Sequence, residues 1–284
     1  MQSERITDSI YVFTSDTYAQ VTAGVVLTSV GAVLIDTLVY PEETKRIRRF
    51  IYDRLDTDVK YVINTHFHAD HTTGTSFFNG ATVIAHEKCR QLLKEHGLQS
   101  LENARQTSPE MQEVVLVLPD VVFNDRMTLF LGDKTLQLWS TPGHSPDSIV
   151  CLVEEDQVLF AADTLMPVPY FVGGSHAEFL ATLQSLEGRN FETVVQGHGE
   201  IILRGEIQGK ITKDIDYLKK LYQFVEQAVN SDSPQGALDA ITVEKCGKSR
   251  VLLNGMVEQL HHQNVTVLAE QLQHTTPTTI EDAN

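Results

Sequence analysis

Short apolar runs separated by polar turns dominate the first part of the chain. Residues 5–14 and 22–36 have the composition of strands, and the turn Ser29-Val30-Gly31 divides the second run into a hairpin. Pro41-Glu42-Glu43 is typical of a helix start, because proline suits the first helical position and acids suit the first turn. Apolar residues then recur at helical spacing as far as Leu55. The pattern predicts strands followed by one amphipathic helix.

Strands and helices alternate from 58 to 96, which is typical of an α/β arrangement. Residues 58–64 form an apolar strand, and a short helix after it ends at Asn79-Gly80, where glycine suits a helix C-terminus. Residues 97–113 are polar and only weakly periodic. We expect a solvated surface excursion there in preference to a lid over a nearby site, although a long loop can act as one.

A β pattern runs from 114 to 162, with turns at Gly132-Asp133 and Glu155-Asp156. Ser175 and Glu178 then form a capping box for a helix over 176–188. His176 follows the cap directly, so we expect it to be a surface residue of the first helical turn.

The chain changes character after about residue 205. Residues 206–230 and 250–272 carry apolar side chains at helical intervals. Neither segment has enough companions for a core of its own, so we expect both to pack on the preceding α/β body or on a second subunit. The pattern predicts a main domain over 1–205, a helical region packed on it over 206–274, and a disordered tail over 275–284. A homodimer is possible.

Composition and charge narrow the class of partner. Hydrophobic residues make up 42% of the 284 residues and charged residues 21%, as in ordinary globular proteins. The formal net charge of -16 disfavours nucleic acid, because phosphate backbones would be repelled. We find no apolar run of about 18 residues and no basic segment leading into an apolar one, so we expect no membrane span and no secretory signal. Three cysteines without a Cys-x-x-Cys pair fit a reducing compartment, and we expect a cytoplasmic protein.

Metal-ligand chemistry is concentrated directly after the apolar run Val59 to Ile63. Four ligand-type residues fall there within six positions, namely His66, His68, Asp70 and His71. Alternate residues at a strand end point the same way, so the first two could hold one ion while the turn carries the others toward a second. Imidazole with carboxylate suits zinc, and also iron or manganese. Histidines clustered by chance are the alternative that this density disfavours.

Further residues of the same types follow other apolar strands. His144 is presented by the rigid loop Thr141-Pro142-Gly143-His144-Ser145-Pro146, Asp163 follows Leu159 to Ala162, and His198 lies between two glycines. Asp36 follows four apolar residues at a sheet end, where it could accept a hydrogen bond from a ligating imidazole or, alternatively, cap a turn. These segments could converge at one edge of a two-sheet core, as in dinuclear hydrolytic sites.

In order, His66-x-His68-x-Asp70-His71, the Pro-Gly-His loop with His144, Asp163, and Gly-His198-Gly resemble the ligand motifs of the metallo-β-lactamase-fold superfamily over residues 5–200. The resemblance implies an α+β fold, a four-layer αβ/βα sandwich with the metals at the edge between the sheets. It implies two divalent metal ions, with zinc favoured and iron or manganese possible. His66, His68 and His144 would hold the first ion, Asp70, His71 and His198 would hold the second, and Asp163 would bridge them.

The same resemblance implies an enzyme, a metal-dependent hydrolase. A water shared by two ions would ionise near neutral pH and attack the substrate, with Asp70 orienting it as well as binding metal. In true lactamases of this fold the position of Asp163 looks like cysteine or serine, whereas an aspartate looks like the glyoxalase II and lactonase branches. We therefore expect cleavage of a small ester, thioester or lactone. A mononuclear iron dioxygenase acting on a thiol or persulfide, a β-lactamase and a phosphodiesterase are the alternatives.

Two further resemblances are weaker. Tyr170 is similar to the position from which lactonase-like members offer a phenol to the substrate carbonyl, but packing beside Phe171 is the interpretation we favour. Lys245, Lys248 and Arg250 lie in the region that supplies cationic groups to glutathione in glyoxalase II-like enzymes. We expect these three residues to be solvated surface charges.

Overall fold

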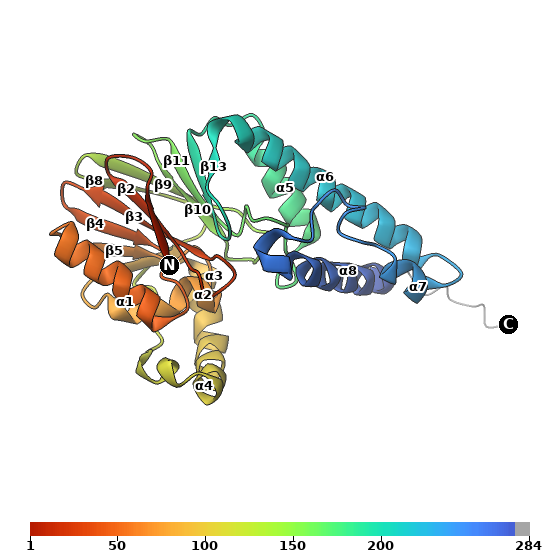
Figure 1. Cartoon of the computed structure of the whole chain (residues 1–284), viewed down its shortest axis with the longest axis horizontal. Helices are drawn as coiled ribbons and strands as arrows, with labels where there is room; N and C mark the ends of the chain where they lie inside the picture. The colour runs from red at the N-terminus through yellow and green to blue at the C-terminus, as the bar shows by residue number, and fades with distance from the viewer. Residues whose placement is uncertain (276–284) are drawn as a thin grey trace.

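The computed structural model describes residues 1–275 and consists of two facing sheets with helices on their outer sides (Figure 1). Apolar side chains of both sheets, among them Ile10, Ile63, Leu136 and Phe160, share one core cluster between the sheets. A second cluster joins the outer face of the first sheet to Ile47 and Ile51, and a third joins the second sheet to the C-terminal helices. These clusters define the four layers of an αβ/βα sandwich, the fold that the sequence predicts.

The first sheet has seven strands in the order of the chain. They are β1 (Gln2–Arg5), β2 (Ile10–Thr14), β3 (Thr22–Thr28), β4 (Gly31–Ile35), β5 (Val59–Ile63), β6 (Thr82–His86) and β7 (Val121–Phe123). Strands β1 to β4 pair antiparallel, whereas β4 to β7 pair parallel because helical connections lie between them. The single run expected over 5–14 is two strands, since the chain turns back between Arg5 and Ile10.

The second sheet has six strands in the order β13-β12-β11-β10-β9-β8. They are β8 (Arg126–Leu131), β9 (Lys134–Ser140), β10 (Ile149–Val153), β11 (Val158–Ala162), β12 (Thr193–Gln196) and β13 (Ile202–Leu203). Only the pair β11 and β12 is parallel, because α5 (His176–Leu186) connects them. The buried strand β11 ends directly before Asp163, so this sheet delivers that carboxylate to the edge between the sheets.

Helices of the N-terminal body lie on the outer face and edge of the first sheet. They are α1 (Pro41–Arg49) with its continuation η1 (Phe50–Arg54), α2 (Ala69–Thr72), η2 (Thr73–Phe77), α3 (Glu87–Leu92), η3 (Leu93–Gly97), α4 (Leu98–Thr107) and η4 (Pro109–Glu113). The segment over 97–113 lies on the surface as expected, but it is not a loop, because α4 and η4 occupy it. Helix α4 has no buried residue, which explains why the sequence lacks a clear apolar stripe there.

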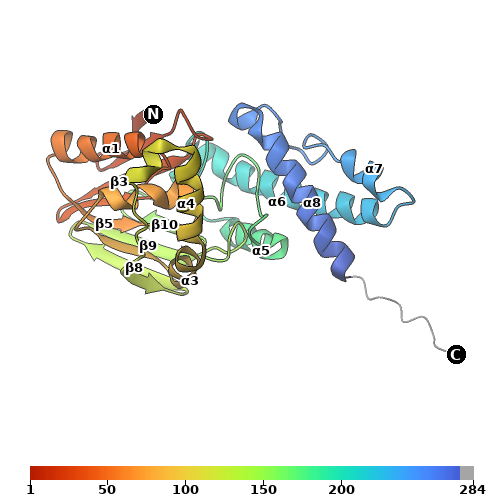
Figure 2. The same ribbon diagram turned by 90° about the horizontal axis from the view of Figure 1, so that it is seen from below.

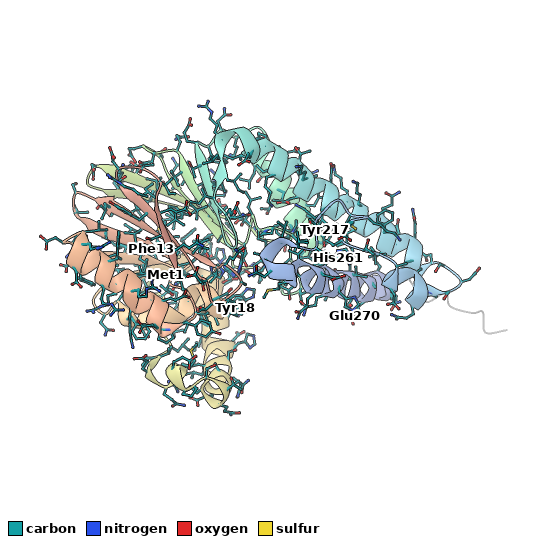
Figure 3. All side chains as sticks on the ribbon, in the orientation of Figure 1. Met1, Phe13, Tyr18, Tyr217, His261 and Glu270 are labelled. Atoms are coloured by element: carbon teal, nitrogen blue, oxygen red, sulfur yellow. The ribbon has the colours of Figure 1, made fainter. Side chains whose placement is uncertain are left out.

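Three helices and a short helical turn form the C-terminal region, namely α6 (Arg204–Val229), α7 (Pro234–Asp239), η5 (Leu252–Gly255) and α8 (Met256–Thr275). Apolar residues of α6 and α8 share a core cluster with β11, β12 and α5, so these helices pack on the body as expected. Figure 3 shows Tyr217 of α6 and His261 of α8 side by side between the two helices. The domain boundary at 205 stays a prediction, and the expected tail lies outside the described residues apart from Thr275.

Two sequence expectations about this region were wrong. His176 is 8% exposed and donates a hydrogen bond from Nε2 to the main-chain oxygen of Leu218 at 2.9 Å, because α6 covers the start of α5. Lys248 is not a solvated charge: its side chain is 6% exposed and forms an ion pair with buried Asp214. Arg250 is exposed and pairs with Glu244, as a surface charge would. Within residues 1–275, none of the helices has both the length and the apolar character needed to cross a bilayer.

Candidate metal centre

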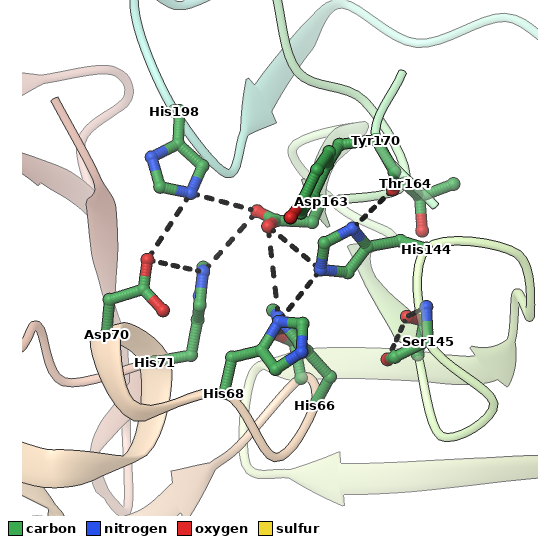
Figure 4. Close-up of polar contacts among 12 residues, drawn as sticks. His66, His68, Asp70, His71, His144, Ser145, Asp163, Thr164, Tyr170 and His198 are labelled. Atoms are coloured by element: carbon green, nitrogen blue, oxygen red, sulfur yellow. Dashed lines mark hydrogen bonds and ion pairs between the residues drawn. The ribbon is translucent and has the colours of Figure 1, made fainter. Parts of the chain in front are cut away.

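The predicted site residues lie at one edge of the sandwich, where strands of both sheets end (Figure 4). The turn after β5 carries His66, His68, Asp70 and His71, the loop between β9 and β10 carries His144, and the ends of β11 and β12 lead to Asp163 and His198. Gly197 permits the close approach of the last two segments, because a Cβ at this position would collide with Asp163 Oδ1. The fold therefore brings together all seven side chains that the sequence pointed to.

Three histidines and one carboxylate oxygen form the first cluster. His68 Nδ1 lies 3.0 Å from His66 Nε2 and 2.9 Å from His144 Nε2. The Oδ2 atom of Asp163 lies 3.2 Å from His144 Nε2 and 3.8 Å from His66 Nε2. Four ligand-type atoms thus surround one point at the end of β11.

The other oxygen of Asp163 belongs to the second cluster. Its Oδ1 atom lies 3.4 Å from His71 Nε2 and 3.5 Å from His198 Nε2. Asp70 Oδ2 lies 3.7 Å from His71 Nε2 and 3.4 Å from His198 Nε2. Each cluster therefore contains one oxygen of the same aspartate.

These residues fit a divalent cation on three observations. Tetrahedral bonds of about 2.0–2.1 Å place ligand atoms about 3.3–3.4 Å apart, close to the spacings above. His71 Nε2 and Asp163 Oδ1 are buried without a hydrogen-bond partner, although they face each other. An uncompensated buried pair of this kind is costly unless a ligand satisfies it. The donor set of imidazole nitrogens and carboxylate oxygens suits zinc, iron and manganese.

Hydrogen bonds on the far side of each ring orient four of the five histidines. The Nδ1 atoms of these rings lie 2.7–3.1 Å from an oxygen acceptor, which fixes the proton on Nδ1 and points the Nε2 lone pair into the cluster. The pairs are His66 with Thr65 Oγ1, His71 with Asp36 Oδ2, His144 with the Tyr170 main-chain oxygen, and His198 with the Ala19 main-chain oxygen. His68 is the exception, because its Nδ1 atom itself faces the cluster.

Burial and neighbouring charge set the protonation of the clusters. Burial and the nearby histidines lower the pKa of His66 well below its usual value and that of His68 to about 3, so both rings are neutral. Burial alone would raise the pKa of Asp163, but His198, His144 and His71 together hold it well below its usual range. In the second cluster burial is outweighed, because Asp70, Asp163 and Asp36 raise the pKa of His71 well above its usual value and Asp163 and Asp70 raise that of His198. A metal ion would have to displace protons there, since neutral imidazole and ionised carboxylate are the forms that bind metal.

Asp36 lies where the sequence expected it. Its Oδ2 atom accepts a hydrogen bond from His71 Nδ1 at 2.8 Å and from the hydroxyl of Thr65 at 2.7 Å, while Oδ1 accepts from the Thr65 amide at 2.9 Å. Burial raises the pKa of Asp36 despite these contacts. The carboxylate therefore fixes the orientation of one ring and the backbone between β5 and the histidine turn.

Tyr170 lies at the wall of a cavity of about 340 Å³ that also contains Asp70, His144, Asp163 and His198. Its side chain is half-buried and its hydroxyl donates to Gln263 Oε1 at 3.0 Å. The favoured interpretation, core packing beside Phe171, was wrong, because only Phe171 enters the core. Met256 and Leu260 of α8 line the same cavity.

Sequence reasoning missed two residues around the site. Tyr18 lines the same cavity, and its pKa is raised to about 12 by burial and by the charge of Asp70. It carries no sequence signal, since a tyrosine in a loop is ordinary. Asn264 is fully buried and accepts a hydrogen bond from the amide of Phe171 at 3.1 Å. A buried amide within the apolar pattern of α8 is the signal that could have found Asn264.

Comparisons with known proteins agree with this geometry. Residues 16–198 match the family model of the metallo-beta-lactamase superfamily. The chain is 26% identical over 196 residues to "Thioesterase pkgB" of Emericella nidulans, covering 67% of this chain and 49% of that protein. It is 24% identical over 220 residues to "Atrochrysone carboxyl ACP thioesterase" of Pseudocercospora fijiensis, covering 76% and 59% respectively. The chain thus spans about half the length of these curated relatives.

A solved structure shares the fold. The metallo-beta-lactamase from Pontibacter korlensis superposes with a TM-score of 0.64 at 22% identity, covering 77% of this chain and 98% of the other. At this identity the likeness concerns the architecture alone.

Proposed function

The chain belongs to the metallo-β-lactamase superfamily, and we propose that it is a hydrolase that uses two divalent metal ions, zinc by preference, to cleave a thioester. The observation that carries the proposal is the position of Asp163. Its two oxygens face two separate groups of ligand-type atoms, 3.2 Å from His144 Nε2 on one side and 3.4 Å from His71 Nε2 on the other. A carboxylate in this position can bridge two cations.

The ligand set follows from the two clusters. His66, His68 and His144 would hold one ion, Asp70, His71 and His198 would hold the other, and Asp163 would contact both. When bound, such ions supply a water nucleophile that is ionised near neutral pH and a Lewis acid for the scissile carbonyl.

The residues of the chain would position the reactants. The carboxylate of Asp70, which is less buried than its neighbours, would orient the attacking water as well as bind metal. The hydroxyl of Tyr170 lies at the cavity wall, so it could donate to the substrate carbonyl after exchanging its bond with Gln263. The backbone acceptors of the histidines would keep the rings in place during the reaction.

A thioester is the substrate class we favour among carbonyl compounds. The two curated relatives described above are named as thioesterases, which supports a thioester over a lactone or another ester. The cavity of about 340 Å³ beside the clusters has room for a small acyl compound. The net charge of -16 supports a small molecule over a nucleic acid as the partner. A cytoplasmic location and a homodimer stay predictions.

A panel of chromogenic substrates tests this function. We expect the zinc-loaded protein to hydrolyse thioesters faster than lactones, phosphodiesters or a cephalosporin. Asp163→Ala and His144→Ala should abolish turnover while circular dichroism stays unchanged, whereas Asp232→Ala, at an exposed aspartate after α6, should retain full activity. Unchanged turnover in either site variant would refute the assignment, and oxygen uptake with a thiol by the iron-loaded protein would favour a dioxygenase.

A further inference from the structure

A second cavity lies directly beside the candidate metal centre, beneath the helical segment over 93–117. Its volume is about 190 Å³, and its walls come from the histidine turn on one side and from η3, α4 and η4 on the other. Figure 1 shows α4 projecting below α2, and Figure 2 shows it at the edge of the body that faces α6 and α8. His68 and Ala69 line both this cavity and the one that holds the clusters, so the two spaces are adjacent at the histidine turn.

The walls of this second cavity are mainly apolar. Phe67, Leu93, Leu101, Ala104, Met111 and Val114 contribute to it. Of the lining residues in the described part of the chain, none is Asp, Glu, Lys or Arg. His96, Ser100 and two threonines also line it, but no charged partner for an ionic group is present among these residues, and the apolar part of the wall would release water in favour of an apolar group.

The cavity is held open by contacts that do not need a ligand. Arg105 of α4 donates from Nε to the main-chain oxygen of Met111 at 3.3 Å and from a terminal nitrogen to that of Val114 at 2.6 Å. Lys45 of α1 pairs with Glu113 at 2.6 Å and ties η4 to the body. These contacts fix the helical wall over the histidine turn, so the apolar space is preformed.

This arrangement gives the polar segment over 97–113 a possible function as one wall of the cavity. Helix α4 buries none of its residues, and Leu101 and Ala104 remain only half-buried where they face the cavity. An apolar group that entered the cavity would complete the burial of these side chains. A helix with this property is better explained as the wall of a binding site than as a connection.

We propose that this cavity binds the apolar acyl group of the substrate, while the scissile carbonyl lies over the clusters beyond His68. The inference rests on the proposed function, because it assumes a carbonyl substrate at the metal centre. Cavities of about 150 Å³ bind benzene, so the present volume fits one aromatic ring or a short alkyl chain. The wider cavity of about 340 Å³, with Tyr170, Met256 and Leu260 at its wall, remains for the leaving group.

Filling the cavity tests the proposal directly. Ala104→Phe places a ring into the space, and Gln106→Phe adds the same ring on an exposed part of α4 as a control. Metal-free protein is titrated with benzamide, an uncharged probe, and its binding is followed by NMR. We expect binding to the wild type and to Gln106→Phe, and about a tenfold loss in Ala104→Phe.

Kinetics on the metal-loaded protein give the second readout. The two substrates are a benzoyl and an acetyl thioester of the same thiol. Ala104→Phe should lower kcat/KM for the benzoyl thioester about tenfold, while kcat/KM for the acetyl thioester stays within about twofold of the wild-type value. Equal losses for the two substrates, or benzamide binding that does not depend on residue 104, would overturn the proposal. If Ala104→Phe abolishes benzamide binding but the wild type hydrolyses none of the substrates, the cavity binds apolar groups and the proposed function is rejected.

A variant that enlarges the space guards against a folding defect in Ala104→Phe. Leu101→Ala should shift the preference toward longer acyl chains, raising the ratio of kcat/KM for octanoyl over butanoyl thioester several-fold. Leu98→Ala removes the same atoms from a side chain that is 62% exposed and does not line the cavity. An unchanged ratio in Leu101→Ala, or an equal shift in Leu98→Ala, would also reject the acyl pocket.

Discussion

The imidazole of His144 donates a hydrogen bond from Nδ1 to the main-chain oxygen of Tyr170 at 2.7 Å. The side chain of Asn264 holds the two peptide groups that flank Tyr170, because it donates to Pro169 O at 2.7 Å and accepts from Phe171 N, in the same peptide group as the Tyr170 carbonyl, at 3.1 Å. Helix α8 therefore fixes the loop that orients one candidate ligand, which couples the C-terminal helices to the metal centre.

Asn264→Leu should weaken metal binding. The substitution keeps the volume but frees the Tyr170 loop, and loss of a group that orients a ligand costs about 10- to 100-fold in affinity. The substitution also leaves the buried Pro169 oxygen and Phe171 amide without their partner, and each unpaired group should lower the free energy of unfolding by about 1–3 kcal/mol. Competition with a chromogenic chelator measures the affinity of the folded protein. Gln263→Ala, which removes only the partner of the Tyr170 hydroxyl, is the control, and equal affinity in both variants would contradict the coupling.

Asp36→Asn should have a similar effect on the second cluster. The Oδ2 atom accepts from both His71 Nδ1 and the Thr65 hydroxyl, and an amide nitrogen in its place would present a donor to two donors. We expect about a 10- to 100-fold loss of metal affinity, measured by the same competition. Asp120→Asn changes a carboxylate that accepts from the Val83 amide away from the site and should retain the wild-type affinity. A wild-type metal affinity in Asp36→Asn would show that Asp36 does not support metal binding.

The ion pairs that Asp214 of α6 forms with two lysines should contribute strongly to the free energy of unfolding. Asp214 is 1% exposed and pairs with both Lys210 and Lys248, and burial lowers the pKa of Lys210 to about 8. Asp214→Ala leaves two cations without their partner, so urea unfolding should reveal a loss of about 3–5 kcal/mol. Asp216→Ala, at the exposed neighbour, should change the free energy of unfolding by less than about 0.5 kcal/mol. A loss below about 1 kcal/mol in Asp214→Ala would show that the pairs are solvated.

Acidification should destabilise the contact between α6 and α8 through His261. Its Nε2 atom donates to Ile241 O at 2.9 Å and its Nδ1 atom accepts from the Tyr217 hydroxyl at 2.9 Å, so a second proton has no acceptor. Burial lowers the pKa of His261 below 6.5, although Glu244 and Glu258 oppose this. The unfolded chain therefore binds more protons below pH 6.5, and stability falls as the pH decreases from there.

Comparison of two neighbouring histidines isolates this effect. The free energy of unfolding is measured at pH 7.5 and 5.5 for the wild type, for His261→Asn and for His262→Asn, whose side chain is exposed. We expect His261→Asn to be less stable at pH 7.5 but to lose less stability on acidification than the other two proteins. Identical pH dependence in all three would exclude His261 as the titrating group.

The side chains of the two clusters could be predicted because each signal is local. A ligand-type residue shortly after an apolar strand marks a sheet end: Asp163 follows its strand directly, and His66, His144 and His198 lie in the turns that follow theirs. The strands themselves follow from apolar runs and turn residues for the same reason.

What could not be predicted depends on contacts between distant segments. The acceptor that orients His198 is a main-chain oxygen 179 residues away, and Asn264 acts on a loop 93 residues before it. Lys248 and His176 were placed on the surface because their burial is created by α6, which the local pattern does not reveal. The helical nature of 98–107 was missed because its apolar side chains face a cavity and leave no continuous apolar stripe.

Metal stoichiometry tests the central claim most directly. Metal-free protein is titrated with zinc while thioester hydrolysis and bound metal are measured on the same samples, with Asp163→Ala in parallel. We predict that activity reaches its maximum at two equivalents per chain and that Asp163→Ala retains at most one tightly bound ion. Full activity at one equivalent, or one iron per chain with thiol-dependent oxygen uptake and no hydrolysis, would contradict the two-metal hydrolase.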